Sequence, residues 1–199
     1  MLEIFGVVFG FLYLFLEFRK SNLMWIVGLG MALVYAIVYC QQGVYAYMCF
    51  QIYYILVSVY GFLQWGKDRL AHKNETSVPV ESSTPEAPIT YRKITLKVFL
   101  WSTIIYAAST VFMVYVLGSY TDDSMPWADS SVTVLSAIAT FWLSKSYREQ
   151  WLVWMIVNFL TVVISLELNL YPTAVLYTVN TIASVWGYFY WKKRGVVLE

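Results

Sequence analysis

Charged side chains are scarce in this chain and are missing from the middle of every long apolar run. Only 13% of the 199 residues are Asp, Glu, Lys or Arg, whereas 60% are hydrophobic and 19% aromatic. Proton relays and ion-coupled transporters use ionisable groups at membrane depth, so this absence argues against a pump. The composition, with a mean hydropathy of +0.62, predicts a polytopic membrane protein rather than a soluble domain.

Motifs for nucleotide hydrolysis, metal binding and covalent catalysis are also missing. The chain has no GxxxxGK[ST] phosphate-binding loop, and its single histidine, His72, has no neighbouring ligand residue. The two cysteines, Cys40 and Cys49, lie in or beside apolar segments without metal-like spacing, so we expect them to be packing residues. No nucleophile–base pair is evident. We therefore expect no catalytic residue, metal, cofactor or nucleic-acid partner, and a passive facilitator fits better than a hydrolase.

Seven apolar runs are long enough to cross a membrane as helices. They lie at residues 2–18, 24–41, 44–66, 95–118, 128–144, 150–168 and 171–191. The first run lacks the basic start and the small-residue cleavage site of a signal peptide, so we expect a genuine span. Between the third and fourth runs, residues 67–93 are rich in Pro, Ser, Thr and Glu, which predicts a solvated linker.

The distribution of basic residues predicts how these helices are oriented. If seven spans alternate in direction, all 13 Lys and Arg residues fall on one side of the membrane. They are Arg19, Lys20, Lys67, Arg69, Lys73, Arg92, Lys93, Lys97, Lys145, Arg148, Lys192, Lys193 and Arg194. The short loops of the other side carry Asp122, Asp123 and Glu167 instead. The positive-inside rule then places the N-terminus outside and the C-terminus in the cytoplasm, and the regularity supports the count of seven.

An internal repeat relates the first three predicted helices to the last three by a constant offset of 126 positions (151 − 25 = 126). The offset pairs Arg19 with Lys145, Trp25 with Trp151, Tyr45 with Tyr171, Ser58 with Ser184, Gly61 with Gly187, Trp65 with Trp191 and Lys67 with Lys193. Because the two triplets are an even number of helices apart, they have the same orientation. The remaining helix acts as the inverter between them.

This pattern predicts an all-α integral membrane protein with seven transmembrane helices in a 3+1+3 arrangement. Its parallel three-helix repeats are similar to those of the SWEET transporters. The expected parts are a first repeat at 1–66, a cytoplasmic linker at 67–93, an inverter helix at 94–118 and a second repeat at 128–194. In such transporters the substrate site lies near the bilayer midplane at the repeat interface.

Polar and aromatic side chains form stripes on four of the predicted helices. The stripes are Tyr47, Gln51, Tyr54 and Ser58; Thr133, Ser136 and Thr140; Trp151, Trp154 and Asn158; and Tyr177, Asn180 and Ser184. A polar side chain in hydrocarbon needs a partner, so these stripes should face the bundle interior. One interpretation is interhelical hydrogen bonding, at about 0.6 kcal/mol for each contact.

The other interpretation is a pocket for a flat, polar and possibly cationic molecule. Aromatic faces attract cations and stack on flat rings, while amides hydrogen-bond hydroxyl or carboxamide groups. We predict that the substrate-binding residues are Gln51, Tyr54, Trp151, Trp154, Asn158, Tyr177 and Asn180. Trp151 repeats Trp25, whereas Trp154 and Asn158 correspond to Gly28 and Ala32. These two unrepeated residues are therefore the ones most expected to touch the substrate.

Three short motifs make the chain resemble the nicotinamide riboside transporter family (PnuC-type). They are Trp151-x-x-Trp154-x-x-x-Asn158, Tyr60-Gly61-x-x-x-Trp65 and its echo Trp186-Gly187-x-x-x-Trp191. The resemblance covers nearly the whole chain apart from residues 67–93. It implies facilitated diffusion of a vitamin-like precursor across the bacterial inner membrane, with net uptake driven by a separate cytoplasmic kinase that phosphorylates the substrate. It also implies a small-molecule partner, either nicotinamide riboside or thiamine, and leaves open a homo-oligomer in the lipid bilayer.

Other functions remain open at this point. A substrate-binding subunit that borrows an ATPase module is a second kind of transport protein, which the repeat and inverter helix disfavour. An intramembrane enzyme would need the catalytic residues that the sequence lacks. A scaffold without transport activity would leave the polar stripes and the duplication unexplained.

Overall fold

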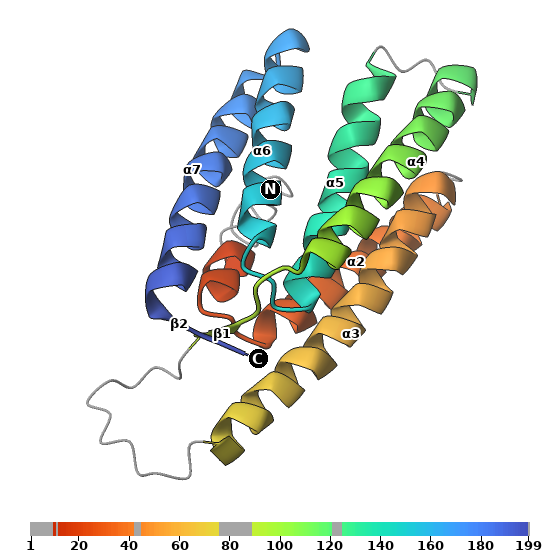
Figure 1. Ribbon diagram of the computed structural model, residues 1–199. Coiled ribbons are helices and arrows are strands. Elements are labelled where there is room, and N and C mark those ends of the chain that lie inside the picture. Colours follow the sequence, from red (N-terminus) through yellow and green to blue (C-terminus); the bar gives the residue numbers. More distant parts are fainter. Residues whose placement is uncertain (1–9, 11, 42–44, 76–88, 121–124, 199) are drawn as a thin grey trace. The chain divides into compact units, whose positions relative to one another are not determined.

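The computed structural model describes residues 10, 12–41, 45–75, 89–120 and 125–198, and most of these residues are helical (Figure 1). They form two compact units, which are described separately. The first unit comprises the described residues up to Tyr91 with Ser144–Ser146 and Arg194–Leu198, and the second comprises Arg92–Leu143 and Tyr147–Lys193. Helices occur at each of the seven predicted runs, so the predicted all-helical character is confirmed.

The first unit contains helical residues 12–18 and the helices α2 (Leu23–Gln41) and α3 (Tyr45–Glu75). Residues 2–9 of the predicted first span lie outside the described residues. Helix α3 continues through 67–75, the beginning of the predicted linker, because this stretch contains charged helix formers and neither Pro nor Gly. The end of the linker forms strand β1 (Ile89–Tyr91), which pairs in parallel with β2 (Gly195–Val197).

The second unit contains α4 (Leu96–Tyr120), α5 (Pro126–Ser144), α6 (Gln150–Glu167) and α7 (Tyr171–Arg194). Proline suits the start of α5 because the first helical N–H has no partner inside the helix. At the end of α6, Asn169 adopts a left-handed conformation (φ 58°), and the N–H of Leu170 donates to the carbonyl of Ser165 at 2.7 Å. This αL turn satisfies a terminal carbonyl of α6 and lets α7 begin at once.

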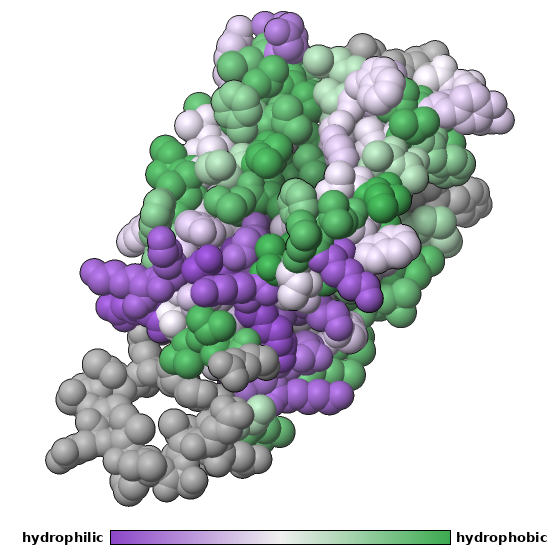
Figure 2. Space-filling view, in the orientation of Figure 1, coloured by the Kyte–Doolittle hydropathy of each residue, from purple (hydrophilic) through white to green (hydrophobic). Residues whose placement is uncertain are grey.

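Four of the described helices are long and apolar enough to cross a membrane. The spans are Leu23–Gln41, Met48–Ala71, Leu96–Tyr120 and Gln150–Glu167. On the face shown in Figure 2, hydrophobic side chains cover the helices and hydrophilic ones gather toward the helix ends. Large apolar side chains on α4 are widely exposed, with Phe112 at 66% and Tyr115 at 65%. Such a surface has the character expected of helices in contact with lipid.

In the first unit, α2 and α3 are joined by a tryptophan that lies against a glycine. Trp25 is 2% exposed, and a Cβ placed on Gly61 would lie 2.5 Å from its Cε2 atom. The ring of Trp65, one helical turn along α3, meets the Trp25 ring edge-on, with centroids 5.2 Å apart. Only glycine at position 61 leaves room for the indole against the α3 backbone.

The second unit repeats this contact with the residues that the offset of 126 predicts. Trp151 of α6 is 1% exposed, and a Cβ on Gly187 of α7 would lie 2.6 Å from its Cε3 atom (25 + 126 = 151; 61 + 126 = 187). Trp191 meets Trp151 edge-on, with centroids 5.8 Å apart. We name these two arrangements the Trp–Gly junctions.

Helices α4 and α5 of the same unit are linked by the indole N–H of Trp142, which donates to Ser102 Oγ at 3.0 Å.

The Trp–Gly junctions lead to a prediction about stability. Gly187→Ala should destabilise the protein by about 1–3 kcal/mol, the usual cost of overpacking, because the new methyl group collides with the Trp151 ring. Gly61→Ala should behave similarly. The measurement is the thermal unfolding midpoint of the purified protein in detergent.

Gly30→Ala is the matched control. Apart from its chain neighbours and the backbone of its own helix, a Cβ at Gly30 of α2 would have no atom within 4 Å. This substitution should leave the midpoint unchanged or raise it slightly, as replacing a helical glycine by alanine usually does. Equal midpoints for Gly187→Ala and Gly30→Ala would show that the junction tolerates a methyl group.

Candidate functional site

Helix α6 carries Trp151, Trp154 and Asn158 on one face, and the structure gives them different roles. Trp151 belongs to the Trp–Gly junction of the second unit and holds α6 against α7. Trp154 is half-buried, and its indole N–H is buried with no hydrogen-bond partner among the described residues. A buried donor without an acceptor is costly. The indole N–H of Trp154 is therefore a candidate group for donating to a ligand.

Asn158 of α6 is hydrogen-bonded to Ser184 of α7, which lies one turn along the helix from Asn180. Asn158 is 7% exposed, and its Nδ2 donates to Ser184 Oγ at 3.1 Å. The Ser184 hydroxyl in turn donates to the backbone carbonyl of Asn180 at 2.8 Å. Tyr177 is half-buried on the adjoining turn of α7. This polar cluster of the second unit can exchange its internal hydrogen bonds for bonds to a polar solute.

Gln51 and Tyr54 belong to the first unit, where both are half-buried on α3. The Tyr54 ring meets that of Tyr53 edge-on, with centroids 5.4 Å apart. Ser58, one turn further along α3, is 6% exposed. The side chain of Tyr47 lies outside the described side chains. The structure therefore places two predicted site residues in the first unit and five in the second.

Two hydroxyl groups of the polar stripe on α5 form hydrogen bonds within their own helix. The Ser136 hydroxyl donates to the carbonyl of Val132 at 2.7 Å, and the Thr140 hydroxyl donates to the carbonyl of Ser136 at 2.8 Å. Hydroxyl groups bonded one turn back are satisfied without any ligand. These contacts agree with the structural interpretation of Ser136 and Thr140.

Tyr13 is a residue of interest that was not among the predicted site residues. Its ring lies 3.4 Å from the place that a Cβ of Gly28 would take, and Ser58 Oγ lies 3.6 Å from the same place. At the corresponding positions the second unit has Ala139 and Trp154 (13 + 126 = 139; 28 + 126 = 154). At these two positions the first unit has an aromatic residue followed by a small one, and the second unit has a small residue followed by an aromatic one. The alignment of the sequence with itself at an offset of 126 already shows this exchange, so Tyr13 could have been found from the sequence.

The structure adds two observations on cysteines and metals. Cys40 and Cys49 are free thiols on exposed residues. Within the described ranges, no group of three or more His, Cys, Asp or Glu side chains is placed to hold a metal ion.

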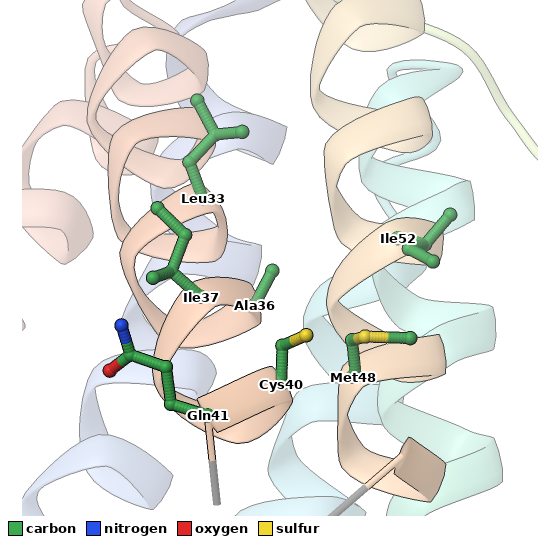
Figure 3. A pocket seen from close by; sticks show the side chains of 7 residues that line it. All are labelled: Leu33, Ala36, Ile37, Cys40, Gln41, Met48 and Ile52. Carbon is green, nitrogen blue, oxygen red and sulfur yellow. The ribbon is translucent and has the colours of Figure 1, made fainter. Parts of the chain in front are cut away.

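A hollow of about 320 Å³ lies between the ends of α2 and α3 in the first unit. Its lining residues, shown in Figure 3, are Leu33, Ala36, Ile37, Cys40, Gln41, Met48 and Ile52. Its surface is apolar, and Ile37 and Ile52 are 59% and 46% exposed. None of the predicted site residues lines it. The hollow therefore lacks the polar groups that orient a hydrophilic substrate.

Comparisons with known proteins bear on the class of the molecule. The family model described as "Nicotinamide mononucleotide transporter" matches residues 1–193. The chain is 22% identical to the nicotinamide riboside transporter PnuC of Escherichia coli (strain K12), over 98% of this chain and 87% of that protein. It is 27% identical to the protein of the same name from Neisseria mucosa, over 70% of this chain and 52% of that protein.

A crystal structure described as that of the vitamin B3 transporter PnuC has a similar fold. It matches with a TM-score of 0.67 at 22% identity, over 94% of this chain and 78% of the other. A likeness at this identity concerns the fold alone, whereas the family model covers almost the entire sequence. The chain therefore belongs to the nicotinamide mononucleotide transporter family, which also contains the PnuC proteins, and it is a multi-pass membrane transporter rather than an enzyme.

Proposed function

We propose that this protein mediates facilitated diffusion of nicotinamide riboside across the bacterial inner membrane. The observation that carries the proposal is the polar cluster of the second unit, in which Asn158 donates to Ser184 and Ser184 donates to the backbone carbonyl of Asn180. Trp154 lies one turn from Asn158 on the same helix and has a buried indole N–H without a partner. The names of the relatives supply the substrate, since they are nicotinamide riboside transporters.

The chemistry of nicotinamide riboside suits these side chains. The molecule has a flat pyridinium ring with one positive charge, a carboxamide and a ribose with several hydroxyl groups. The indole of Trp154 offers a face for the cationic ring. The amides of Gln51, Asn158 and Asn180 can hydrogen-bond the carboxamide and ribose. Tyr54 and Tyr177 add aromatic surface and hydroxyl groups, and Trp151 supports α6 through the Trp–Gly junction.

The transport mode follows from the inventory of ionisable groups. No Asp, Glu, Lys, Arg or His lies in the middle of a predicted span, so the chain offers no obvious group for proton or ion coupling. Facilitated diffusion only equilibrates the free substrate, and accumulation then requires its removal. A soluble kinase that phosphorylates nicotinamide riboside in the cytoplasm would supply this driving force.

The proposal includes the predicted 3+1+3 architecture with the N-terminus outside and the C-terminus in the cytoplasm. The Trp–Gly junctions support the repeat, because residues paired by the offset make the same contact in both units. If seven spans alternate, all 13 basic residues fall on one side, which supports the orientation. A homo-oligomer is compatible with this arrangement.

Thiamine is the second candidate substrate, since it is also a flat monocation with a hydrogen-bonding tail. The aromatic and amide residues fit both molecules. An ATPase-coupled substrate-binding subunit is a weaker alternative, since the family model describes a transporter.

Transport by the purified protein tests the proposed function directly. Proteoliposomes should equilibrate labelled nicotinamide riboside without ATP and without an ion gradient, because the proposed mechanism needs neither. Kinase and ATP enclosed in the vesicles should convert equilibration into accumulation.

Protein-free liposomes and labelled thiamine are the controls in this experiment. If the proteoliposomes equilibrated thiamine but not nicotinamide riboside, thiamine would be the substrate, and the proposed mechanism of facilitated diffusion would still hold. Uptake that strictly requires a proton or sodium gradient would contradict facilitated diffusion.

Substitutions on α6 test the site. Trp154→Ala should weaken nicotinamide riboside binding by about tenfold or more, equivalent to about 1.4 kcal/mol. Asn158→Ala should weaken it less, by about two- to tenfold, because Asn158 only exchanges one hydrogen bond for another. The first removes the aromatic face and a free donor, and the second removes an amide of the polar cluster. Titration of binding by isothermal calorimetry measures the effect, with thermal unfolding as a check on the fold.

Trp127→Ala is the matched control for Trp154→Ala, because Trp127 of α5 is 62% exposed and lies outside the proposed site. Gln41→Ala, at an exposed amide at the end of α2, serves the same purpose for Asn158→Ala. Unchanged affinity in both α6 variants would remove them from the site.

A further inference from the structure

A buried polar cluster in the first unit has no part in the proposed substrate site. At its centre is Asp68 of α3, which is 3% exposed. Gln64 Nε2 donates to Asp68 Oδ1 at 3.0 Å, and Ser146 Oγ donates to Asp68 Oδ2 at 2.8 Å. Lys20 Nζ lies 3.7 Å from Asp68 Oδ2 and donates to Thr90 Oγ1 at 2.8 Å as well as to the Thr90 carbonyl.

The cluster brings together segments that are far apart in the sequence. Lys20 lies in the turn before α2, Thr90 in strand β1, and Ser146 in the turn between α5 and α6. Lys20 and Ser146 occupy corresponding positions of the proposed repeats (20 + 126 = 146). Both also have left-handed backbones, with φ of 49° and 63°. Asp68 therefore binds the equivalent turn of each repeat, through an ammonium group in one case and a hydroxyl group in the other.

The contact of Asp68 with Ser146 should be less costly to break than its ion pair with Lys20. Lys20, Gln64 and Thr90 all belong to the α2–α3–β1 part of the chain. If Ser146 moved away, Asp68 would retain its ion pair with Lys20 and its hydrogen bond from Gln64. Loss of the Ser146 contact thus breaks one hydrogen bond without leaving a buried charge unpaired. A contact of this kind can open and close repeatedly.

We propose that the Asp68–Ser146 contact is a reversible clasp that holds the Ser144–Ser146 turn against α3 and opens during transport. Helix α6 begins at Gln150, shortly after this turn, and carries Trp154 and Asn158. Release of the turn frees the start of the helix on which the proposed site depends. The clasp lies among the basic residues of the chain, on the side assigned to the cytoplasm. The inference rests on the transport activity of the family and not on the identity of the substrate.

A cysteine reporter in the turn tests the clasp. Ser144 is 0% exposed, so Ser144→Cys, in a chain that also carries Cys40→Ala and Cys49→Ala, should react slowly with a maleimide. Adding Ser146→Ala removes the hydroxyl that donates to Asp68 and should raise the labelling rate by about fivefold, the effect of one lost hydrogen bond on an opening equilibrium.

Thr90→Val is the matched control, because it removes a hydroxyl from the same cluster without touching the Ser146 contact. The labelling rate should then change by less than about twofold. Nicotinamide riboside should alter the rate in the reporter chain that keeps Ser146, since a contact that opens during transport responds to substrate. A permanent structural contact would show no such response.

Labelling that neither Ser146→Ala nor nicotinamide riboside changes would overturn the clasp. A rate that Ser146→Ala raises, but that neither nicotinamide riboside nor thiamine changes in protein shown to transport one of them, would indicate a permanent structural contact and would overturn the clasp. The substrate measurement uses an unaltered clasp, so it decides the question if Ser146→Ala fails to fold.

Discussion

The packing of an indole against a glycine sets the helix register on which the proposed site depends. In the second unit, Trp151 lies against Gly187 near the start of α6 and the end of α7. Two turns further along α6, Asn158 meets Ser184, which precedes Gly187 by three positions on α7. The two helices therefore run antiparallel, and the tight contact at one end fixes which polar residues meet further along. Aromatic burial of this kind suits a membrane protein, because helix association in lipid relies on close packing rather than on the hydrophobic effect.

The two units share this junction but differ in the residues beside it. The first unit places Tyr13 next to Gly28, whereas the second has Ala139 and Trp154 at the corresponding positions. Asn158 likewise replaces Ala32, while Ser58 and Ser184 are the same. Packing residues are thus retained between the proposed repeats, and the groups proposed to recognise a solute are not. Such a division is expected when an asymmetric molecule is bound by a protein with internal repeats.

Much of the helical fold could be predicted from the sequence, because long apolar runs and the offset of 126 are properties of the chain itself. The partner of Asn158 and the packing role of Trp151 depend on which helix faces fall together, and only the structure shows these. The cluster around Asp68 was missed for a different reason. The composition of residues 67–93 predicted a solvated linker, but α3 continues to Glu75 and Asp68 is 3% exposed. The average composition of a polar segment does not show that one of its carboxylates, that of Asp68, is buried.

The hydrogen bonds of the second unit suit a proposed site that binds a polar solute and still releases it. Asn158 already donates to Ser184 without a ligand, so a bound solute replaces one hydrogen bond by another. Such exchanges contribute only about 0.5–1.5 kcal/mol each, which limits the affinity. The indole N–H of Trp154 differs, since it has no partner to give up among the described residues. Binding strength should therefore come mainly from Trp154, through stacking and a new hydrogen bond, while the asparagines orient the solute at little net gain. The proposed facilitated diffusion needs this balance, because a site that held its substrate tightly would release it too slowly on the far side.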